Sequence, residues 1–367
     1  MRIRPSAAAV VLLLAACTVT GCTMTPTSAP TTVPTVSDSR PLAELDLLDA
    51  PRDYVGASTA VLGSASIEPV MGAAAPVLPT TVTSHDLDGD TEVTVTSADA
   101  IIGLDISGSI GATLFGLGLG DRVVGRDVST TFPEAEDLPV ITSGGHSINS
   151  EAILALRPDL VITDGTVGPI DVLLQLRDAG IAVVFVDTDP SIEGVGELAR
   201  QVAAATGATE AGELLATRLE GEIAAKVAEI AAVAPSKPED RLRMIFLYLR
   251  GSAGIYYLFG EESGADVLIE SLGGIDVAGE IGWDGMKPMT DEALVQANPD
   301  LILVMTDGLS SVGGVDALLE AKPAIALTRA GENKRFVDMA DGEVLSFGPR
   351  TPAVFDALAR AIYAPAR

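Results

Sequence analysis

Two residues of one predicted strand could together provide an oxygen ligand for a metal ion. Tyr248 and Arg250 stand two positions apart in the apolar run LRMIFLYLR, and residues i and i+2 of a strand point to the same face of a sheet. A guanidinium beside a phenol favours the phenolate, which is a good ligand for ferric iron. The alternatives are a tyrosine of the strand core and a surface charge at the strand end.

A histidine elsewhere in the chain could supply a second ligand. His146 is one of only two histidines, follows two glycines and precedes a predicted helix that Ser147 or Ser150 would cap. The corresponding place later in the chain, at 285–287, reads Gly-Met-Lys, so the scaffold does not demand a histidine. Since haem iron is held by His or Tyr, the histidine and the Tyr–Arg pair together could clamp a flat porphyrin. A surface or packed histidine is the alternative.

An internal repeat indicates how these residues are positioned. The stretch EAILALRPDLVI at 151–162 aligns with EALVQANPDLIL at 292–303, and Asp-Gly follows both. The repeating unit is a short helix, a Pro-Asp break and a buried strand; chance similarity of two ordinary helix–strand units is the alternative. Strands alternating with helices on both sides of 208–234 predict two Rossmann-like α/β lobes with parallel sheets, joined by one long helix over that range.

The N-terminal part of the chain is predicted to anchor the rest. Residues 1–22 have a basic start, a ten-residue apolar run and two lipobox-like sites, of which Cys22 is preferred over Cys17 for lipidation. Residues 23–80 are rich in Thr, Pro and Ser at first and lack periodicity later, which predicts a flexible tether and a poorly ordered segment. The N-terminal lobe is then expected over 81–207 and the C-terminal lobe over 235–367.

Composition excludes several classes of function. The net charge of −28 at pH 7 argues against nucleic acid as a partner and against direct contact with an anionic membrane surface. Catalysis has little support, since the chain has no P-loop, no G-x-S-x-G motif and no cysteine after Cys22. We therefore expect a binding protein, with an exported enzyme or an adhesin as the alternative class.

The stretches around these residues resemble a known family. GLGDRVVGRDVSTTFPEAEDLP, GGHSINSEAILALRPDLVI and FLYLRGSAGIYYLFGEESGADVLIESLGG are similar to the hemin-binding lipoproteins of Gram-positive heme ABC importers, over about residues 95–365. The resemblance implies that His146 and Tyr248 ligate heme iron axially and that Arg250 hydrogen-bonds the tyrosine oxygen. It also implies that one glutamate per lobe, Glu151 and Glu292, docks on the permease.

The expected function is capture of ferric heme between the lobes and delivery to an ABC permease, by a monomer that a lipid anchor holds outside the cytoplasm. A ferric siderophore or a corrinoid is the alternative ligand. Further residues are predicted to line the heme pocket, by stacking, by binding propionates or by packing at its mouth: Tyr256, Tyr257, Arg126, Lys287 and Trp283.

Overall fold

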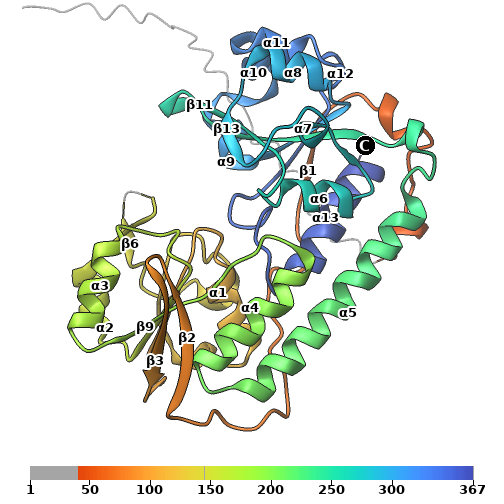
Figure 1. Cartoon of the computed structure of the whole chain (residues 1–367). Helices are drawn as coiled ribbons and strands as arrows, with labels where there is room; N and C mark the ends of the chain where they lie inside the picture. Colours follow the sequence, from red (N-terminus) through yellow and green to blue (C-terminus); the bar gives the residue numbers. More distant parts are fainter. Residues whose placement is uncertain (1–39, 144, 367) are drawn as a thin grey trace, which may run out of the picture. The chain divides into compact units, whose positions relative to one another are not determined.

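A computed structural model describes residues 40–143 and 145–366. It contains two α/β lobes joined by helix α5 (Thr209–Val233) (Figure 1). This arrangement confirms the predicted fold class. Cys17, Cys22 and the lipobox-like sites lie outside the described residues.

The N-terminal lobe is built on a four-stranded parallel sheet. Its strands, in spatial order, are β5 (Val123–Arg126), β4 (Ile101–Leu104), β8 (Leu160–Thr163) and β9 (Ala182–Phe185). Apolar runs such as LVIT are buried throughout, as expected for strands covered on both faces. The accompanying helices are α1 (Ser109–Gly116), α2 (Ser150–Leu156), α3 (Ile170–Asp178) and α4 (Ile192–Ala205).

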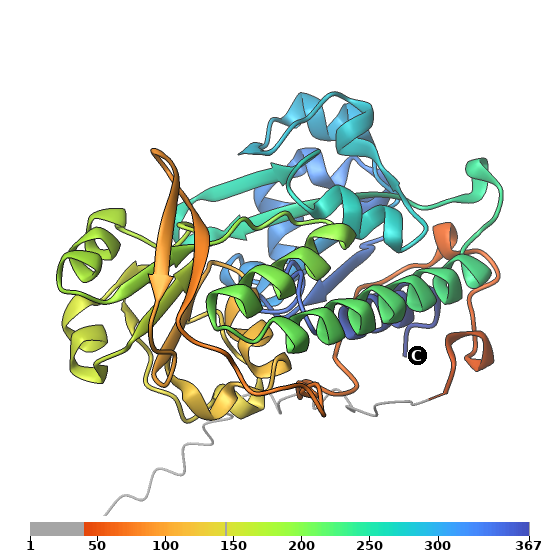
Figure 2. The same ribbon diagram turned by 60° about the horizontal axis from the view of Figure 1, so that its bottom comes forward.

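Two small hairpins accompany this lobe. The first pairs β2 (Thr80–Asp86) with β3 (Gly89–Val95) and lies beside β9 (Figure 2). It is tied there by Arg177, which donates two hydrogen bonds to Asp86. The second pairs β6 (Thr142–Ser143) with β7 (Ser147–Ile148). Residues 145–146 lie in the turn of this second hairpin.

The C-terminal lobe has a seven-stranded mixed sheet in the order β1-β15-β14-β10-β11-β13, with β12 beside the start of β10. The pairs that involve β11 are antiparallel and the others are parallel. The strands are β1 (Ser58–Ala60), β10 (Arg243–Arg250), β11 (Ile255–Phe259), β12 (Ile275–Asp276), β13 (Met286–Pro288), β14 (Leu301–Met305) and β15 (Phe336–Met339). The helices are α6 (Ala265–Ser271), α7 (Val277–Glu280), α8 (Asp291–Ala297), α9 (Thr306–Ser311), α10 (Gly314–Ala321), α11 (Pro323–Ala326), α12 (Arg329–Glu332) and α13 (Thr351–Tyr363).

The sequence repeat has a clear structural basis. Helices α2 and α8 both end at a left-handed residue, Arg157 with φ 50° and Asn298 with φ 40°, directly before the Pro-Asp pair. The carboxylate of Asp159 then accepts a hydrogen bond from the backbone N–H of Ala100 at 3.2 Å, next to β4. Asp300 does the same for Arg243 N–H at 3.0 Å, at the start of β10. In each lobe the repeated aspartate thus fixes the start of the neighbouring strand.

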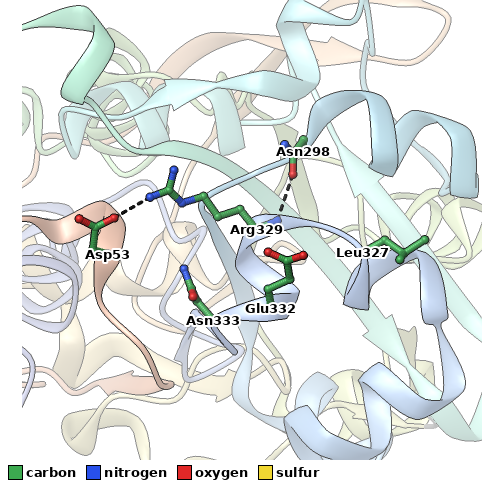
Figure 3. A pocket seen from close by; sticks show the side chains of 6 residues that line it. All are labelled: Asp53, Asn298, Leu327, Arg329, Glu332 and Asn333. Carbon is green, nitrogen blue, oxygen red and sulfur yellow. Dashed lines mark hydrogen bonds and ion pairs between the residues drawn. The ribbon is translucent and has the colours of Figure 1, made fainter.

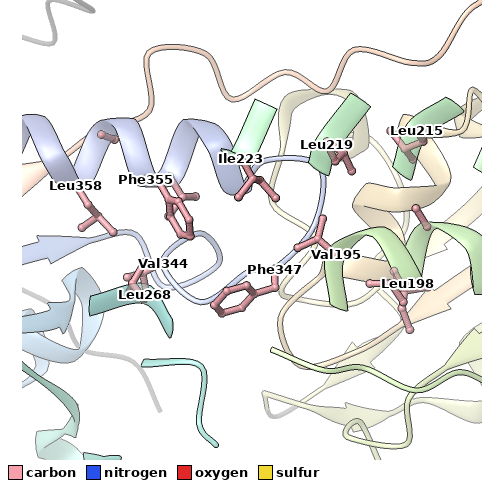
Figure 4. Close-up of a cluster of buried hydrophobic side chains, with 14 of the residues drawn as sticks. Val195, Leu198, Leu215, Leu219, Ile223, Leu268, Val344, Phe347, Phe355 and Leu358 are labelled. Atoms are coloured by element: carbon pink, nitrogen blue, oxygen red, sulfur yellow. The ribbon is translucent and has the colours of Figure 1, made fainter. Parts of the chain in front are cut away.

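Helix α5 contributes to a core shared by both lobes. Its buried side chains contact α4 on one side and α13 on the other (Figure 4). Burying such aliphatic and aromatic groups is the main favourable contribution to folding. The residues of this core that Figure 4 labels are Val195, Leu198, Leu215, Leu219, Ile223, Leu268, Val344, Phe347, Phe355 and Leu358.

Residues 42–79, part of the range 23–80 that was expected to be a flexible tether and a poorly ordered segment, instead make specific contacts with both lobes. Strand β1 pairs with β15 in parallel, and Leu42 is buried with its N–H bound to Glu229 on α5 at 2.7 Å. Further on, Val70 N–H donates to Gly116 O at 2.8 Å in the N-terminal lobe. We call residues 42–79 the strap; Figure 1 traces it in red and orange. Partners distant in the sequence, rather than local periodicity, hold it in place.

A buried arginine attaches the strap to the C-terminal lobe. Arg335 is 1% exposed, and its guanidinium donates to Ser58 Oγ at 2.9 Å and to Ile362 O at 2.9 Å. It also lies 4.6 Å from the ring centroid of Tyr54. Burial lowers the pKa of Arg335 to about 10, so this side chain is charged at neutral pH.

Replacing Arg335 with methionine is expected to lower the free energy of unfolding by about 3 kcal/mol, because buried carbonyl groups lose their donor. Urea denaturation followed by circular dichroism measures this. Lys334→Met is the matched control: its side chain is 55% exposed and paired with the exposed Asp316, so the loss should stay below about 1 kcal/mol. Equal losses in the two variants would contradict the role given to Arg335.

Candidate functional site

Tyr248 lies near the carboxyl end of β10, on an aromatic face of the C-terminal sheet. Its ring stacks on Tyr257 of β11, with centroids 6.5 Å apart and planes at 17°, and on Phe259 at 6.0 Å and 21°. The side chain is half-buried. The packing holds the ring in place, and the partial exposure leaves the residue accessible to a ligand.

Arg250 lies over the face of the Tyr248 ring, as the strand alternation predicts. The guanidinium carbon is 4.4 Å from the ring centroid, a distance typical of a cation–π contact. Arg250 Nη2 donates to Asp341 Oδ2 at 2.8 Å, and Nη1 donates to Leu249 O at 2.8 Å. The guanidinium therefore covers the Tyr248 ring, while the hydrogen bond to the tyrosine oxygen that the resemblance implies stays a prediction.

His146 lies in the turn between β6 and β7 and is exposed. The turn needs Gly145, whose φ is +91°, a region that favours glycine. The hairpin is fixed from two directions: Ile148 N–H donates to Gly168 O at 2.7 Å, and Thr142 Oγ1 accepts from Val128 N–H at 3.1 Å. The helix that follows is capped by Asn149, not by Ser147 or Ser150 as the sequence suggested, because the hairpin occupies residues 147–148.

The loops that carry this hairpin rest on two buried carboxyl groups. Asp127 Oδ1 accepts from Ser129 N–H at 2.8 Å, and Asp127 Oδ2 accepts from Asp105 N–H at 3.1 Å. Asp105 in turn accepts from Ser109 N–H at 2.8 Å and Ile110 N–H at 3.0 Å at the start of α1. Burial, together with the nearby Asp127 carboxylate, raises the pKa of Asp105 to about 7. The hydrogen bonds of Asp105 and Asp127 thus fix the loops at the carboxyl ends of β4 and β5.

Of the additional pocket residues on the C-terminal lobe, only Tyr257 shares the face of Tyr248. Tyr256 points to the opposite face, where Lys322 Nζ lies 4.0 Å from its ring centroid. Trp283 is also on that face and donates from Nε1 to Leu258 O at 3.0 Å. Tyr256 and Tyr257 lie on opposite faces because residues 255–259 form strand β11, not the loop that the sequence suggested, and a strand alternates its side chains between two faces.

Arg126 and Lys287, which were predicted to bind heme propionates, have other surroundings in the structure. Arg126 donates to the backbone carbonyls of Asp127 and Thr130, at 3.3 and 3.1 Å. Lys287 is exposed on the edge strand β13 and is paired in register with Leu258, on the face away from Tyr248. We therefore leave Lys287 out of the proposed site, together with Tyr256 and Trp283.

Glu151 and Glu292 occupy matching, exposed positions. Each is the second residue of a seven-residue helix, α2 and α8 respectively. A carboxylate in the first turn interacts favourably with the helix dipole while its head group stays in water. The structure therefore presents one accessible acidic residue per lobe at equivalent places in the fold.

The other histidine has a different environment. His85 Nδ1 lies 3.0 Å from Asp90 Oδ1 and 3.6 Å from Asp187 Oδ2. It belongs to the β2–β3 hairpin, and its side chain is 31% exposed. The partners of the His85 ring are therefore Asp90 and Asp187, neither of which belongs to the Tyr248–Arg250 pair.

Two polar cavities lie away from these residues. One, of about 480 Å³, is lined by residues around α12, where Arg329 reaches Asp53 (Figure 3). The other is lined mainly by carboxylates between α6 and α7. None of the residues that line either cavity was predicted from the sequence as part of the ligand site. Within the described part of the chain, no helix is both long and apolar enough to cross a bilayer.

One residue of the site was missed from the sequence. Asp341 follows β15 at the carboxyl end of the sheet and holds Arg250. Its position after the apolar strand FVDM was a usable signal, because ligand-site residues in parallel α/β sheets come from the loops after the strands. Its partner on β10 could not be identified without the strand order.

Comparison with known proteins defines the class. Residues 106–341, more than half of the chain, match the periplasmic binding protein family, and the chain belongs to that family. It is therefore a binding protein and not an enzyme.

Several relatives within this class are informative. A curated relative from Bacillus subtilis, described as an uncharacterized ABC transporter substrate-binding lipoprotein, is 28% identical over 253 residues, which are 68% of this chain and 76% of that protein. A solved structure of the heme binding protein HmuT is 40% identical, has a TM-score of 0.79 and covers 86% of this chain and 99% of its own. The periplasmic heme-binding protein RhuT from Roseiflexus is 36% identical, with a TM-score of 0.66, and covers 73% of this chain and 98% of its own.

Proposed function

We propose that this protein captures ferric heme and delivers it to an ABC permease. The observation that carries the proposal is the preassembled pair on β10: the Arg250 guanidinium lies 4.4 Å from the centre of the Tyr248 ring. Tyrosine is a known ligand of heme iron, and this one lies half-buried at the end of its strand with its ring held by Arg250, Tyr257 and Phe259.

The solved relatives support the choice of ligand. HmuT is titled a heme binding protein, and three of its structures carry alanine in place of an arginine, a tyrosine or a histidine. The substituted tyrosine and arginine stand two positions apart, as Tyr248 and Arg250 do here. The heme-binding protein BhuT, titled as a complex with two hemes, is 32% identical to this chain.

The proposed mechanism is capture without chemical change. Tyr248 binds the ferric iron from the C-terminal lobe, and His146 binds it from the opposite side of the macrocycle. Arg250, which covers the ring of Tyr248, would stabilise the bond between the tyrosine and the iron. Helix α5 and the strap both connect the lobes, so we expect only small movements between them.

The protein would be anchored through a lipid and would contact the permease through its two lobes. Acylation of Cys22, or of Cys17, would hold the protein at the outer face of the cell membrane. The description of the Bacillus relative as a substrate-binding lipoprotein supports this placement. Glu151 and Glu292 would contact basic residues of the permease, one from each lobe.

Hemin titration followed by visible absorption tests the proposal. We expect a saturable Soret band at about one heme per chain, and an altered band with at least tenfold weaker binding for His146→Ala. His85→Ala is the matched control, since it removes the other histidine, and it should leave the spectrum unchanged. If the wild-type protein gives no saturable band, heme is not the ligand, and the same titration with ferric siderophores and corrinoids follows.

A further inference from the structure

An exposed aliphatic side chain follows each of the two proposed docking glutamates by about one helical turn. Leu154 on α2 is 47% exposed, and Val295 on α8 is 48% exposed. Each stands three positions after its glutamate, Glu151 or Glu292, and residues three apart on a helix are neighbours on its surface. Each lobe therefore presents a carboxylate beside an aliphatic group.

Neither aliphatic side chain is used in the hydrophobic core. The residue before each one, Ile153 in α2 and Leu294 in α8, is fully buried and packs in the core of its own lobe. Within residues 40–143 and 145–366, Leu154 and Val295 belong to none of the clusters of packed hydrophobic side chains. The free energy of removing these two groups from water is therefore available for binding a partner.

The sequence repeat retains this combination in both lobes. Single exposed apolar residues are common on protein surfaces, so their exposure alone would mean little. Two other positions that are exposed in both copies of the repeat differ in chemical type: Ala155 corresponds to Gln296, and Arg157 corresponds to Asn298. Glutamate and an aliphatic residue are kept at the two positions that are neighbours on the helix surface.

The charge of this surface indicates the kind of partner that it fits. Helices α2 and α8 contain no lysine, arginine or histidine. Among the residues that the structure describes, neither Glu151 nor Glu292 has a partner in an ion pair. The matching partner is a protein surface with a basic residue next to an apolar depression, present once for each lobe. An anionic lipid surface would be repelled by the carboxylates and by the net charge of −28.

We propose that Leu154 and Val295 are apolar contact residues of the permease-docking surface, one in each lobe beside the proposed glutamate. This inference rests on the function proposed above, because the permease is the partner. The carboxylates would govern the rate and orientation of docking, whereas burial of the two aliphatic groups would govern how long the complex lasts.

The test measures how the whole protein binds to the permease of the heme importer, reconstituted in lipid nanodiscs, by surface plasmon resonance. Leu154→Gln and Val295→Gln replace each aliphatic group by a polar side chain that is a good helix former. We expect each substitution to raise the dissociation rate about tenfold and to leave the association rate nearly unchanged. The double variant should dissociate about a hundredfold faster, because the two residues lie in different lobes and act independently.

The dependence on salt distinguishes an apolar contact from general damage. Replacing Glu151 and Glu292 together by glutamine should flatten the dependence of the association rate on ionic strength, whereas the two apolar variants should keep the wild-type dependence. Leu214→Gln is the matched control, since Leu214 is 43% exposed on α5, and it should dissociate as the wild type does. Unchanged dissociation of Leu154→Gln and Val295→Gln, or an equal increase for Leu214→Gln, would overturn the proposal.

Nanodiscs without permease test the alternative partner. If the two apolar variants lose binding to these empty nanodiscs to the same extent as to the loaded ones, the aliphatic groups contact lipid and the proposal is wrong.

Hemin titration of the same variants separates this proposal from the choice of ligand, since Leu154→Gln and Val295→Gln should bind hemin as the wild type does. Docking is measured with and without hemin. If the wild-type protein binds the permease but not hemin, the proposed ligand fails, and faster dissociation of the variants still supports the docking role. If the protein binds hemin and the permease but the variants dissociate as the wild type does, the docking role fails alone. Absence of any permease binding by a protein that binds hemin would overturn delivery and this docking surface together.

Discussion

Substituting phenylalanine for Tyr248 is expected to raise the dissociation constant for hemin by about a hundredfold, equivalent to about 2.7 kcal/mol. The phenyl ring keeps the stacking on Tyr257 and Phe259 and the contact with Arg250. Only the oxygen that would bind iron is removed. The loss should therefore appear in the Soret band and in affinity, with no change in thermal stability beyond a few degrees.

The matched control is Tyr257→Phe. Tyr257 pairs in register with Tyr248, on the same face of the sheet and with a parallel ring, so it experiences similar packing. This variant should bind hemin nearly as the wild type does. A wild-type spectrum and affinity for Tyr248→Phe would exclude the tyrosine as an iron ligand, and the same loss in both variants would indicate a packing effect.

Reversing the charge of both Glu151 and Glu292 to lysine is expected to abolish permease-dependent heme uptake while hemin binding is preserved. Both side chains are exposed in the first turn of short helices, so the substitutions weaken each helix by no more than about 1 kcal/mol. Opposed like charges at an interface are strongly unfavourable. Each single reversal should reduce uptake about tenfold, because the glutamate of the other lobe still makes its contact.

Uptake is measured as heme-dependent growth of cells that carry the permease, next to hemin titration of the purified variants. Asp171→Lys is the control, since Asp171 is an exposed acidic residue in the first turn of α3 in the same lobe as Glu151. It should leave uptake unchanged. Wild-type uptake by the double variant would remove the two glutamates from the docking surface.

Much of the architecture could be predicted because its signals are local. The Pro-Asp repeat marks the same helix–strand unit in each lobe, and the i, i+2 spacing on β10 places Arg250 beside Tyr248. Both features depend on residues that are neighbours in the sequence. The long apolar periodicity of 209–233 likewise identified helix α5.

The features that escaped prediction depend on distant partners. Strand β1 is only Ser-Thr-Ala and gains its pairing from β15, so no pattern within 43–79 distinguished it from a loop. The face on which Tyr256 lies could not be predicted, because strand β11 is defined by its pairing with β10 and with β13. Asp341 could be recognised as the partner of Arg250 only from the strand order, which brings the end of β15 close to the end of β10.

The pairing of β1 with β15 also sets an order of events during synthesis. Ser58 lies opposite Val337 in register, so one of these strands is among the first described elements to be made and the other among the last. The C-terminal sheet therefore cannot be completed while the chain is still being translated up to β15. Contacts of such long sequence separation slow folding. The C-terminal sheet of this protein is therefore among the last parts of the fold to be completed.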